Sequence, residues 1–150
     1  METYLIQLAT AFIGSFGFAM LFNLRNRALL AGALGGFFTW LVYLLARNIG
    51  DAGIFLSSVI ASGLGALYAE FLARIFKCPA TLFYIPAVVP LISGSSLYYT
   101  MSAAVDADWV GVRSYGLETL YFTLGIACGI FLVSGVLHIV RENRNKKSTQ

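Results

Sequence analysis

The sequence contains very few charged residues and very few cysteines. Only 11% of its 150 residues are Asp, Glu, Lys or Arg, whereas 59% are hydrophobic. A soluble domain of this length does not need so much apolar surface, so the composition predicts an integral membrane protein. The two cysteines, Cys78 and Cys128, are too few and too far apart in sequence for a disulfide framework. We interpret both as small apolar residues.

The sequence also lacks the motifs of catalysis and of nucleotide binding. Its single histidine, His138, has no neighbouring nucleophile and acid with which to form a triad. Neither a Walker lysine signature nor a strand-led glycine fingerprint occurs, and no residue spacing is typical of a metal site. We therefore expect no enzyme activity, no cofactor and no metal. The net charge of +3 does not indicate nucleic acid, because the basic excess suits the anionic headgroups of a bilayer.

Five apolar segments predict an all-α membrane protein with about five transmembrane helices. The segments are continuous and lack a two-residue alternation, which excludes a β-barrel. The hydrocarbon of a bilayer is about 30 Å thick and takes roughly 20 apolar residues as a helix, so each segment is long enough to cross. We predict a single transmembrane domain over 1–140, a basic tail over 141–150, one longer loop over 102–116, and spans at about 4–24, 28–46, 54–76, 82–101 and 117–140.

The basic residues predict the orientation of these spans. With five crossings, one side has only Arg47 and Arg113, and the other collects the remaining eight: Arg25, Arg27, Arg74, Lys77, Arg141, Arg144, Lys146 and Lys147. Lys and Arg near span ends stay in the cytoplasm. The asymmetry therefore predicts an outside N-terminus and a cytoplasmic C-terminus.

Small residues recur four positions apart in three spans: Gly32 with Gly36, Ala61 with Gly65, and Gly125 with Gly129. Such pairs let helix backbones approach closely in lipid. We favour helix packing within one subunit over a dimer-specific face. One subunit nevertheless has only these five helices, so a homo-oligomer or another assembly is expected.

Glu70 and Arg74 stand four residues apart in the third span. This spacing suits an ion pair on one helical face, and a position near the end of the span allows water to reach the pair. An acid within a span is also a candidate for a functional site. Two interpretations stay open, an interfacial ion pair and a role in proton coupling or in a substrate path.

The stretch IPAVVPLISGSSLYYTM at 85–101 is the most informative one. Pro86 and Pro90 each remove a backbone hydrogen bond, and irregular backbone at membrane depth is tolerated only where it faces protein or a watered cavity. Residues 91–101 can restart as a half-helix whose positive end suits a carboxylate or phosphate. Ser93, Ser95 and Ser96 would add hydroxyl groups there. Broken helices of this kind hold the substrate in many secondary transporters, whereas the alternative is a merely kinked helix.

Two stretches together, GFAMLFNLRNRAL at 17–29 and IPAVVPLISGSSLYYTM at 85–101, resemble the threonine/serine exporter family. The likeness is to the small membrane subunit of its two-component form, and relatives include succinate exporter subunits. The matching positions are Gly17, Phe18, Asn23, Arg27, Pro86, Pro90, Gly94 and Tyr98. Arg25 and Ser93 stand where relatives often have proline. The resemblance implies a larger membrane subunit of the same family as partner, and a small carboxylate as substrate.

Two functions are therefore weighed. The first is a subunit of a secondary exporter in the bacterial cytoplasmic (inner) membrane, working by alternating access on threonine/serine-like amino acids or succinate-like dicarboxylates. Its expected substrate pathway contains Asn23, Pro86, Pro90, Ser93, Gly94, Ser95, Ser96 and Tyr98. The alternative is a non-transporting scaffold that stabilises a partner membrane protein.

Overall fold

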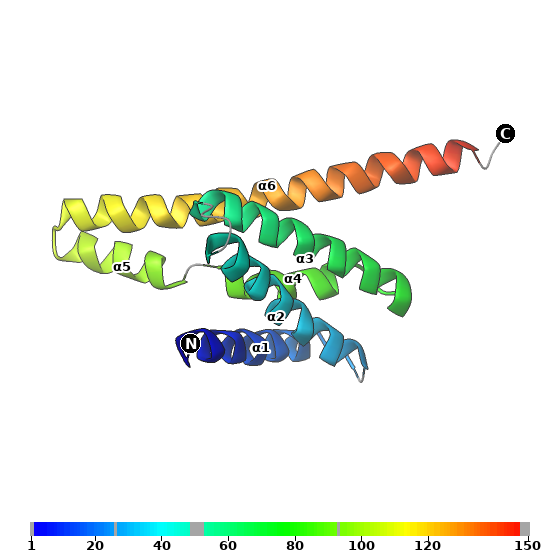
Figure 1. The fold of residues 1–150 in the computed structure, drawn as a ribbon, viewed down its shortest axis with the longest axis horizontal. Helices are drawn as coiled ribbons and strands as arrows, with labels where there is room; N and C mark the ends of the chain where they lie inside the picture. The colour runs from blue at the N-terminus through cyan, green and yellow to red at the C-terminus, as the bar shows by residue number, and fades with distance from the viewer. Residues whose placement is uncertain (1, 26, 49–52, 93, 148–150) are drawn as a thin grey trace.

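The computed structural model is an all-α protein, and it describes residues 2–25, 27–48, 53–92 and 94–147 (Figure 1). Six α-helices and one 3₁₀-helix occur in these residues. They are α1 (Glu2–Leu21), α2 (Arg27–Asn48), α3 (Ile54–Phe76), α4 (Thr81–Val88), η1 (Val89–Leu91), α5 (Gly94–Val105) and α6 (Trp109–Lys147). The described helices agree with the predicted all-α class.

Four of these helices, α1, α2, α3 and α6, are long and apolar enough to cross a membrane. A fifth crossing results if α4, η1 and α5 count as one span, because the two parts of this segment, Thr81–Leu91 and Gly94–Val105, meet at a bend of 52°. The number of spans thus agrees with the predicted five when the bent segment is counted as one of them. The chain is a multi-pass membrane protein.

Successive spans run in opposite directions (Figure 1). The α1–α2 and α3–α4 connections lie at the same end of the molecule as the last residues of α6, and the beginning of α1 lies at the other end. The hairpin of α5 and the first part of α6 extends beyond the remaining helices at that N-terminal end. The fold therefore has the alternation on which the predicted charge asymmetry depends.

Helix α4 and the η1 turn that follows it form the most buried part of the bundle. They contact α1, α2 and α3. Phe83, Ala87 and Leu91 are completely buried, although the other helices leave many large apolar side chains exposed. Because lipid replaces water around a membrane protein, those exposed side chains suit the bilayer, and the buried ones define the internal core.

The predicted small-residue pairs lie at helix contacts within this chain. A Cβ placed on Gly65 of α3 would stand 3.0 Å from the Thr39 hydroxyl oxygen of α2. A Cβ placed on Gly129 of α6 would stand 2.5 Å from the Val59 carbonyl oxygen of α3. A side chain at position 129 would collide with backbone, and one at position 65 would be tight, so these small residues pack against other helices of the same chain, as we favoured.

The interruption of the fourth span does not lie at Pro86. That residue is inside α4, and the helix continues past it to Val88 because the Val89 N–H still donates to the Ile85 carbonyl. Pro90 lies in the 3₁₀ turn η1, and Ile92, which follows this turn, has extended backbone with ψ of 111°. The expected restart as a half-helix occurs at Gly94, so the break is shorter and later than the prolines alone suggest.

The predicted loop over 102–116 is mostly helical. α5 continues to Val105, and α6 begins at Trp109 after a three-residue turn. Asp108 caps α6, because its carboxylate accepts a hydrogen bond of 3.1 Å from the Gly111 N–H, as acidic residues at helix starts do. At about 1.5 Å per residue, the 39 residues of α6 extend well beyond one bilayer crossing.

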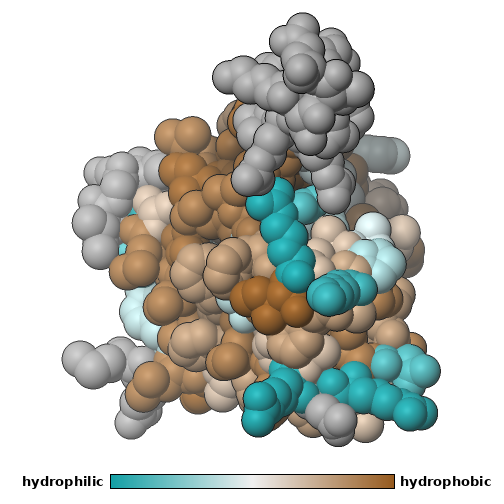
Figure 2. Space-filling model, turned by 90° about the vertical axis from the view of Figure 1, so that its right-hand side faces the viewer, coloured by the Kyte–Doolittle hydropathy of each residue, from teal (hydrophilic) through white to brown (hydrophobic). Residues whose placement is uncertain are grey.

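Basic side chains gather at the end of the molecule where the α1–α2 and α3–α4 connections lie. Arg25, Arg27, Arg74 and Lys77 are all exposed there. Figure 2 views this end and shows hydrophilic side chains grouped on a largely hydrophobic surface. Such a border between charged and apolar surface is typical of the membrane–water interface.

Candidate functional site

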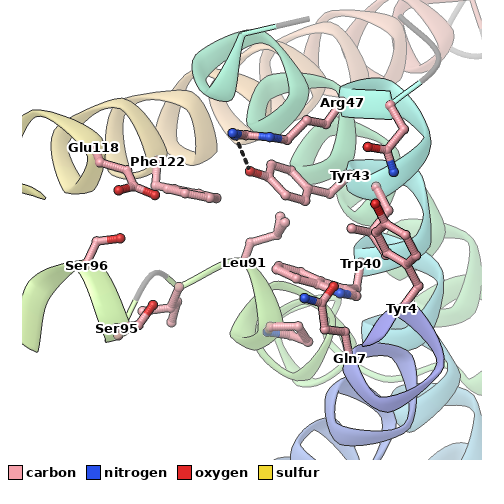
Figure 3. Close-up of a pocket in the computed structure, with 15 residues that line it drawn as sticks. Tyr4, Gln7, Trp40, Tyr43, Arg47, Leu91, Ser95, Ser96, Glu118 and Phe122 are labelled. Atoms are coloured by element: carbon pink, nitrogen blue, oxygen red, sulfur yellow. Dashed lines mark hydrogen bonds between the residues drawn. The ribbon is translucent and has the colours of Figure 1, made fainter. Parts of the chain in front are cut away.

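A cavity of about 470 Å³ lies where the fourth span is interrupted. Its walls come from α1, α2, η1, α5 and α6, and Pro90, Leu91, Ile92 and Gly94 line it at the break itself (Figure 3). This volume is within the range of about 300–1,000 Å³ that small-molecule sites occupy. The backbone on both sides of the break thus lines a cavity.

Helix α2 contributes an aromatic and cationic face to the cavity. Trp40, Tyr43 and Arg47 are spaced at three and four residues, which places them on one side of the helix. The rings of Trp40 and Tyr43 stack with centroids 5.1 Å apart. The Arg47 guanidinium donates a hydrogen bond of 3.2 Å to the Tyr43 hydroxyl oxygen (Figure 3). Tyr43 therefore helps to hold the cation at the cavity.

The opposite wall carries the negative charge. Glu118 and Phe122 come from α6, and Ser95 and Ser96 come from the first turn of α5. Figure 3 shows Glu118 and Ser96 on the side of the cavity away from Trp40. The Phe122 ring lies 5.4 Å from the Tyr43 ring, centroid to centroid, so aromatic contact connects the two walls.

Helix α1 closes the cavity with Tyr4 and Gln7. The Gln7 side-chain oxygen and the Trp40 indole nitrogen are both buried, and neither has a hydrogen-bond partner among the described residues. Gln7 and Trp40 also line an adjacent cavity of about 270 Å³, which continues along α1 past Thr10 and Gly14. Buried polar groups are nearly always paired, so this place is chemically unusual.

The arrangement suits a small ligand that carries both charges. Arg47 and the positive end of α5 favour a carboxylate, whereas Glu118 favours an ammonium group. In the described part of the chain, no salt bridge joins Arg47 to Glu118, whereas Glu70 and Arg74 form an ion pair. Neither charge is neutralised by an ion pair among the described residues, and the Arg47 guanidinium also donates to the Tyr43 hydroxyl. The described residues contain no group of three or more His, Cys, Asp or Glu side chains that could hold a metal.

The structure brings together four of the residues predicted for the substrate pathway, namely Pro90, Gly94, Ser95 and Ser96. Ser93 lies outside the described residues. The remaining three, Asn23, Pro86 and Tyr98, do not line this cavity.

Each of these three has a different environment. Asn23 lies in the α1–α2 turn with φ of 57°, a left-handed conformation that asparagine tolerates. Pro86 is buried in the helix core. Tyr98 is exposed, with its ring edge-on to Tyr99. The structure thus places Asn23 in a turn, Pro86 in the core and Tyr98 on the surface, and none of the three lines the cavity.

Glu70 and Arg74 lie near a separate cavity at the other end of α4. Glu70 lines this cavity of about 310 Å³ with Thr81, Tyr84 and Ser134. The Arg74 guanidinium is 3.9 Å from the Glu70 carboxylate, and the side chains are 63% and 34% exposed respectively. The predicted ion pair therefore exists, in a loose and partly solvated form.

Sequence reasoning missed most of the cavity's polar groups. Trp40, Tyr43 and Arg47 lie three and four residues apart on α2, a spacing common on interfacial helices, whereas Gln7 and Glu118 are isolated polar residues on α1 and α6. From the sequence, Arg47 was identified only as one of the two basic residues predicted to lie outside the membrane. Its position beside Tyr43, one turn earlier, was the available signal, since aromatic and cationic side chains at this spacing meet on one helical face.

Comparison with known proteins gives one family. A family model described as threonine/serine exporter, ThrE, matches residues 7–136, which is most of the chain. No solved structure matches the chain. The matched range contains the whole of the break and every residue of the cavity except Tyr4.

Proposed function

We propose that this chain, which belongs to the threonine/serine exporter family, supplies a substrate site of a secondary exporter for small carboxylate-bearing metabolites. Membership of this family points to a transporter rather than to an enzyme. The observation that carries the proposal is the joint presence of Arg47 and Glu118 in a cavity at an interrupted span. Interrupted helices provide ligand contacts in many secondary transporters.

An α-amino acid fits this cavity better than a dicarboxylate does. Its carboxylate would contact Arg47 and the first turn of α5, and its ammonium group would contact Glu118. A succinate-like dicarboxylate would bring a second negative charge toward Glu118. Like charges at close range repel, and this repulsion is the usual means of rejecting a wrong ligand. Threonine/serine-like amino acids are therefore the proposed substrates.

The proposed mechanism is alternating access around the buried α4–η1 segment. The cavity with Arg47 lies at the η1 end of α4, and the cavity with Glu70 lies at the beginning of α4. Ligand sites that open in turn to the two faces need such cavities at both ends of a closed core. Glu70 is the proposed proton-coupling group, because an acid with access to water within a span can change its charge during the cycle.

The proposed assembly contains a larger membrane subunit of the same family, and a homo-oligomer of this chain is a second arrangement. Support comes from the two-stretch resemblance and from the small number of spans. The proposed location is the bacterial inner membrane, with the N-terminus outside and the C-terminus in the cytoplasm. Arg25, Arg27, Arg74 and Lys77 at one end support this orientation.

Substrate counterflow tests the proposal. The full chain, purified with any membrane partner that accompanies it, is reconstituted in proteoliposomes preloaded with unlabelled threonine. Uptake of radiolabelled threonine is expected, and Arg47→Gln should reduce it at least about tenfold, because a charged hydrogen bond to the carboxylate contributes about 1.5–3 kcal/mol.

Arg113→Gln is the matched control for this experiment. Arg113 is the other basic residue at the same end of the bundle; it is exposed and does not line the cavity. Equal loss in both variants would mean that total positive charge matters rather than the cavity. Undiminished transport with Arg47→Gln in a folded complex would favour the alternative of a non-transporting scaffold.

A further inference from the structure

We propose that Gln7 and Trp40 recognise the side-chain hydroxyl group of the transported amino acid. This inference rests on the proposed function, because it assigns a specificity contact within the same cavity. It begins from the two buried polar atoms at the α1–α2 wall, the Gln7 side-chain oxygen and the Trp40 indole nitrogen, which have no partner among the described residues.

The positions of the two side chains connect them to the break. Gln7 comes from α1 and Trp40 from α2, and both line the main cavity and the adjacent one of about 270 Å³. Pro90 and Ile92 line the same two cavities. Gln7, Trp40 and the interrupted backbone therefore form the boundary between the cavities, and Figure 3 shows Gln7 beside Trp40 there.

The chemistry of the two atoms is complementary to a hydroxyl group. An indole N–H donates and an amide oxygen accepts, and a hydroxyl is the small neutral group that both donates and accepts. A methyl group at the same place would leave both atoms unpaired. Unpaired buried groups are costly, so a site of this type discriminates strongly against an analogue that lacks the hydroxyl.

Both atoms are closed to solvent in this conformation, so the hydroxyl enters when the wall moves. Such movement belongs to the alternating-access cycle proposed above, in which the walls of the cavity open and close around the ligand. The competing explanation is that a small shift of α1 joins Gln7 directly to Trp40 as a structural contact. The experiment below separates these two explanations.

The test compares amino acids that differ only in the hydroxyl. Counterflow of threonine and of 2-aminobutyrate, in which hydrogen replaces the hydroxyl, is measured with the full chain and its co-purified partner. The unmodified protein is expected to prefer threonine about 10- to 100-fold, the range for one or two unmade hydrogen bonds to buried groups. Trp40→Phe and Gln7→Met should each lower the ratio of threonine to 2-aminobutyrate transport several-fold, because each variant removes one of the two hydrogen-bond partners of the hydroxyl.

Tyr84→Phe is the matched control. The Tyr84 hydroxyl is also buried without a partner among the described residues, but Tyr84 lines the cavity near Glu70 instead. Its substitution should leave the preference for threonine intact. Equal losses of threonine and 2-aminobutyrate transport in Trp40→Phe and Gln7→Met would overturn the proposal and identify a structural contact. Transport of both amino acids without preference would overturn it while the proposed function stands.

Tryptophan fluorescence provides a readout that does not need transport. The chain contains two tryptophans, and Trp109 is exposed and outside the cavity, so Trp109→Phe leaves Trp40 as the single emitter. Threonine should shift the Trp40 emission and 2-aminobutyrate should not. Identical shifts with both ligands would contradict hydroxyl recognition, and no binding of either, with no counterflow, would remove the proposed function itself.

Discussion

Gly36 of α2 lies directly against Ser15 of α1: a Cβ on Gly36 would stand 2.6 Å from the Ser15 Cβ and 3.1 Å from the Pro86 carbonyl oxygen of α4. A Cβ atom cannot rotate away from such a contact, so the three helices meet here only because residue 36 is glycine. This crossing fixes the distance between the core helix α4 and the two helices that carry Gln7 and Trp40.

Gly36→Ala should therefore destabilise the protein. Overpacking a tight contact costs about 1–3 kcal/mol, which exceeds the gain of up to about 1 kcal/mol from better helix propensity. The measurement is the midpoint temperature of unfolding in detergent, with the fraction of protein that stays monodisperse as the signal. Gly17→Ala is the control, because a Cβ on Gly17 of α1 would meet nothing within 4 Å. Equal stability of the two variants would contradict the role of this contact.

Glu118→Gln should change substrate selectivity rather than abolish all transport. Removal of the negative charge weakens attraction for the ammonium group and ends repulsion of a second carboxylate. We expect threonine counterflow to fall about tenfold and succinate counterflow to rise, on the scale of one charged hydrogen bond. Asp106→Asn serves as control, since Asp106 is exposed and outside the cavity. Unchanged selectivity in Glu118→Gln would exclude this residue from ligand binding.

Glu70→Gln distinguishes proton coupling from a simple ion pair. A coupling role predicts loss of transport driven by a pH gradient, with counterflow retained, because counterflow needs no net proton movement. Arg74→Gln breaks the same 3.9 Å pair but keeps the carboxylate. If both variants retain gradient-driven transport, the pair is interfacial only. Either substitution should change stability by less than about 1 kcal/mol, since such exposed pairs contribute little.

The predicted topology is tested by labelling single cysteines with a membrane-impermeant thiol reagent in intact cells. Cys78 and Cys128 are first replaced by serine. Asp106→Cys, in the α5–α6 turn, should react from outside, whereas Arg25→Cys, after α1, should react only after permeabilisation. Labelling of both from one side would mean that α4 and α5 form a re-entrant segment instead of a crossing.

Much of the fold could be predicted because the bilayer restricts the choice. Continuous apolar runs of this length must form helices in lipid, and α3 begins and ends where the pattern placed it, at Ile54–Phe76. The position of the break was harder to predict from the sequence. Pro86 satisfies the sequence criterion for interruption, yet α4 continues through it, because its surroundings in the core, and not the missing hydrogen bond alone, decide whether a helix bends.

The sequence by itself determined that the protein lies in a lipid bilayer, that it is helical, roughly where its spans lie and how unevenly its basic residues are distributed. Each of these depends on local composition and on the thickness of a bilayer. It also marked Pro90, Gly94, Ser95 and Ser96 as unusual. Only the tertiary structure decided that Arg47, Glu118, Gln7 and Trp40 meet at one cavity. These residues come from α1, α2 and α6, so they meet only if the helices cross closely. Contacts of glycine residues between segments distant in the sequence set how closely the helices cross.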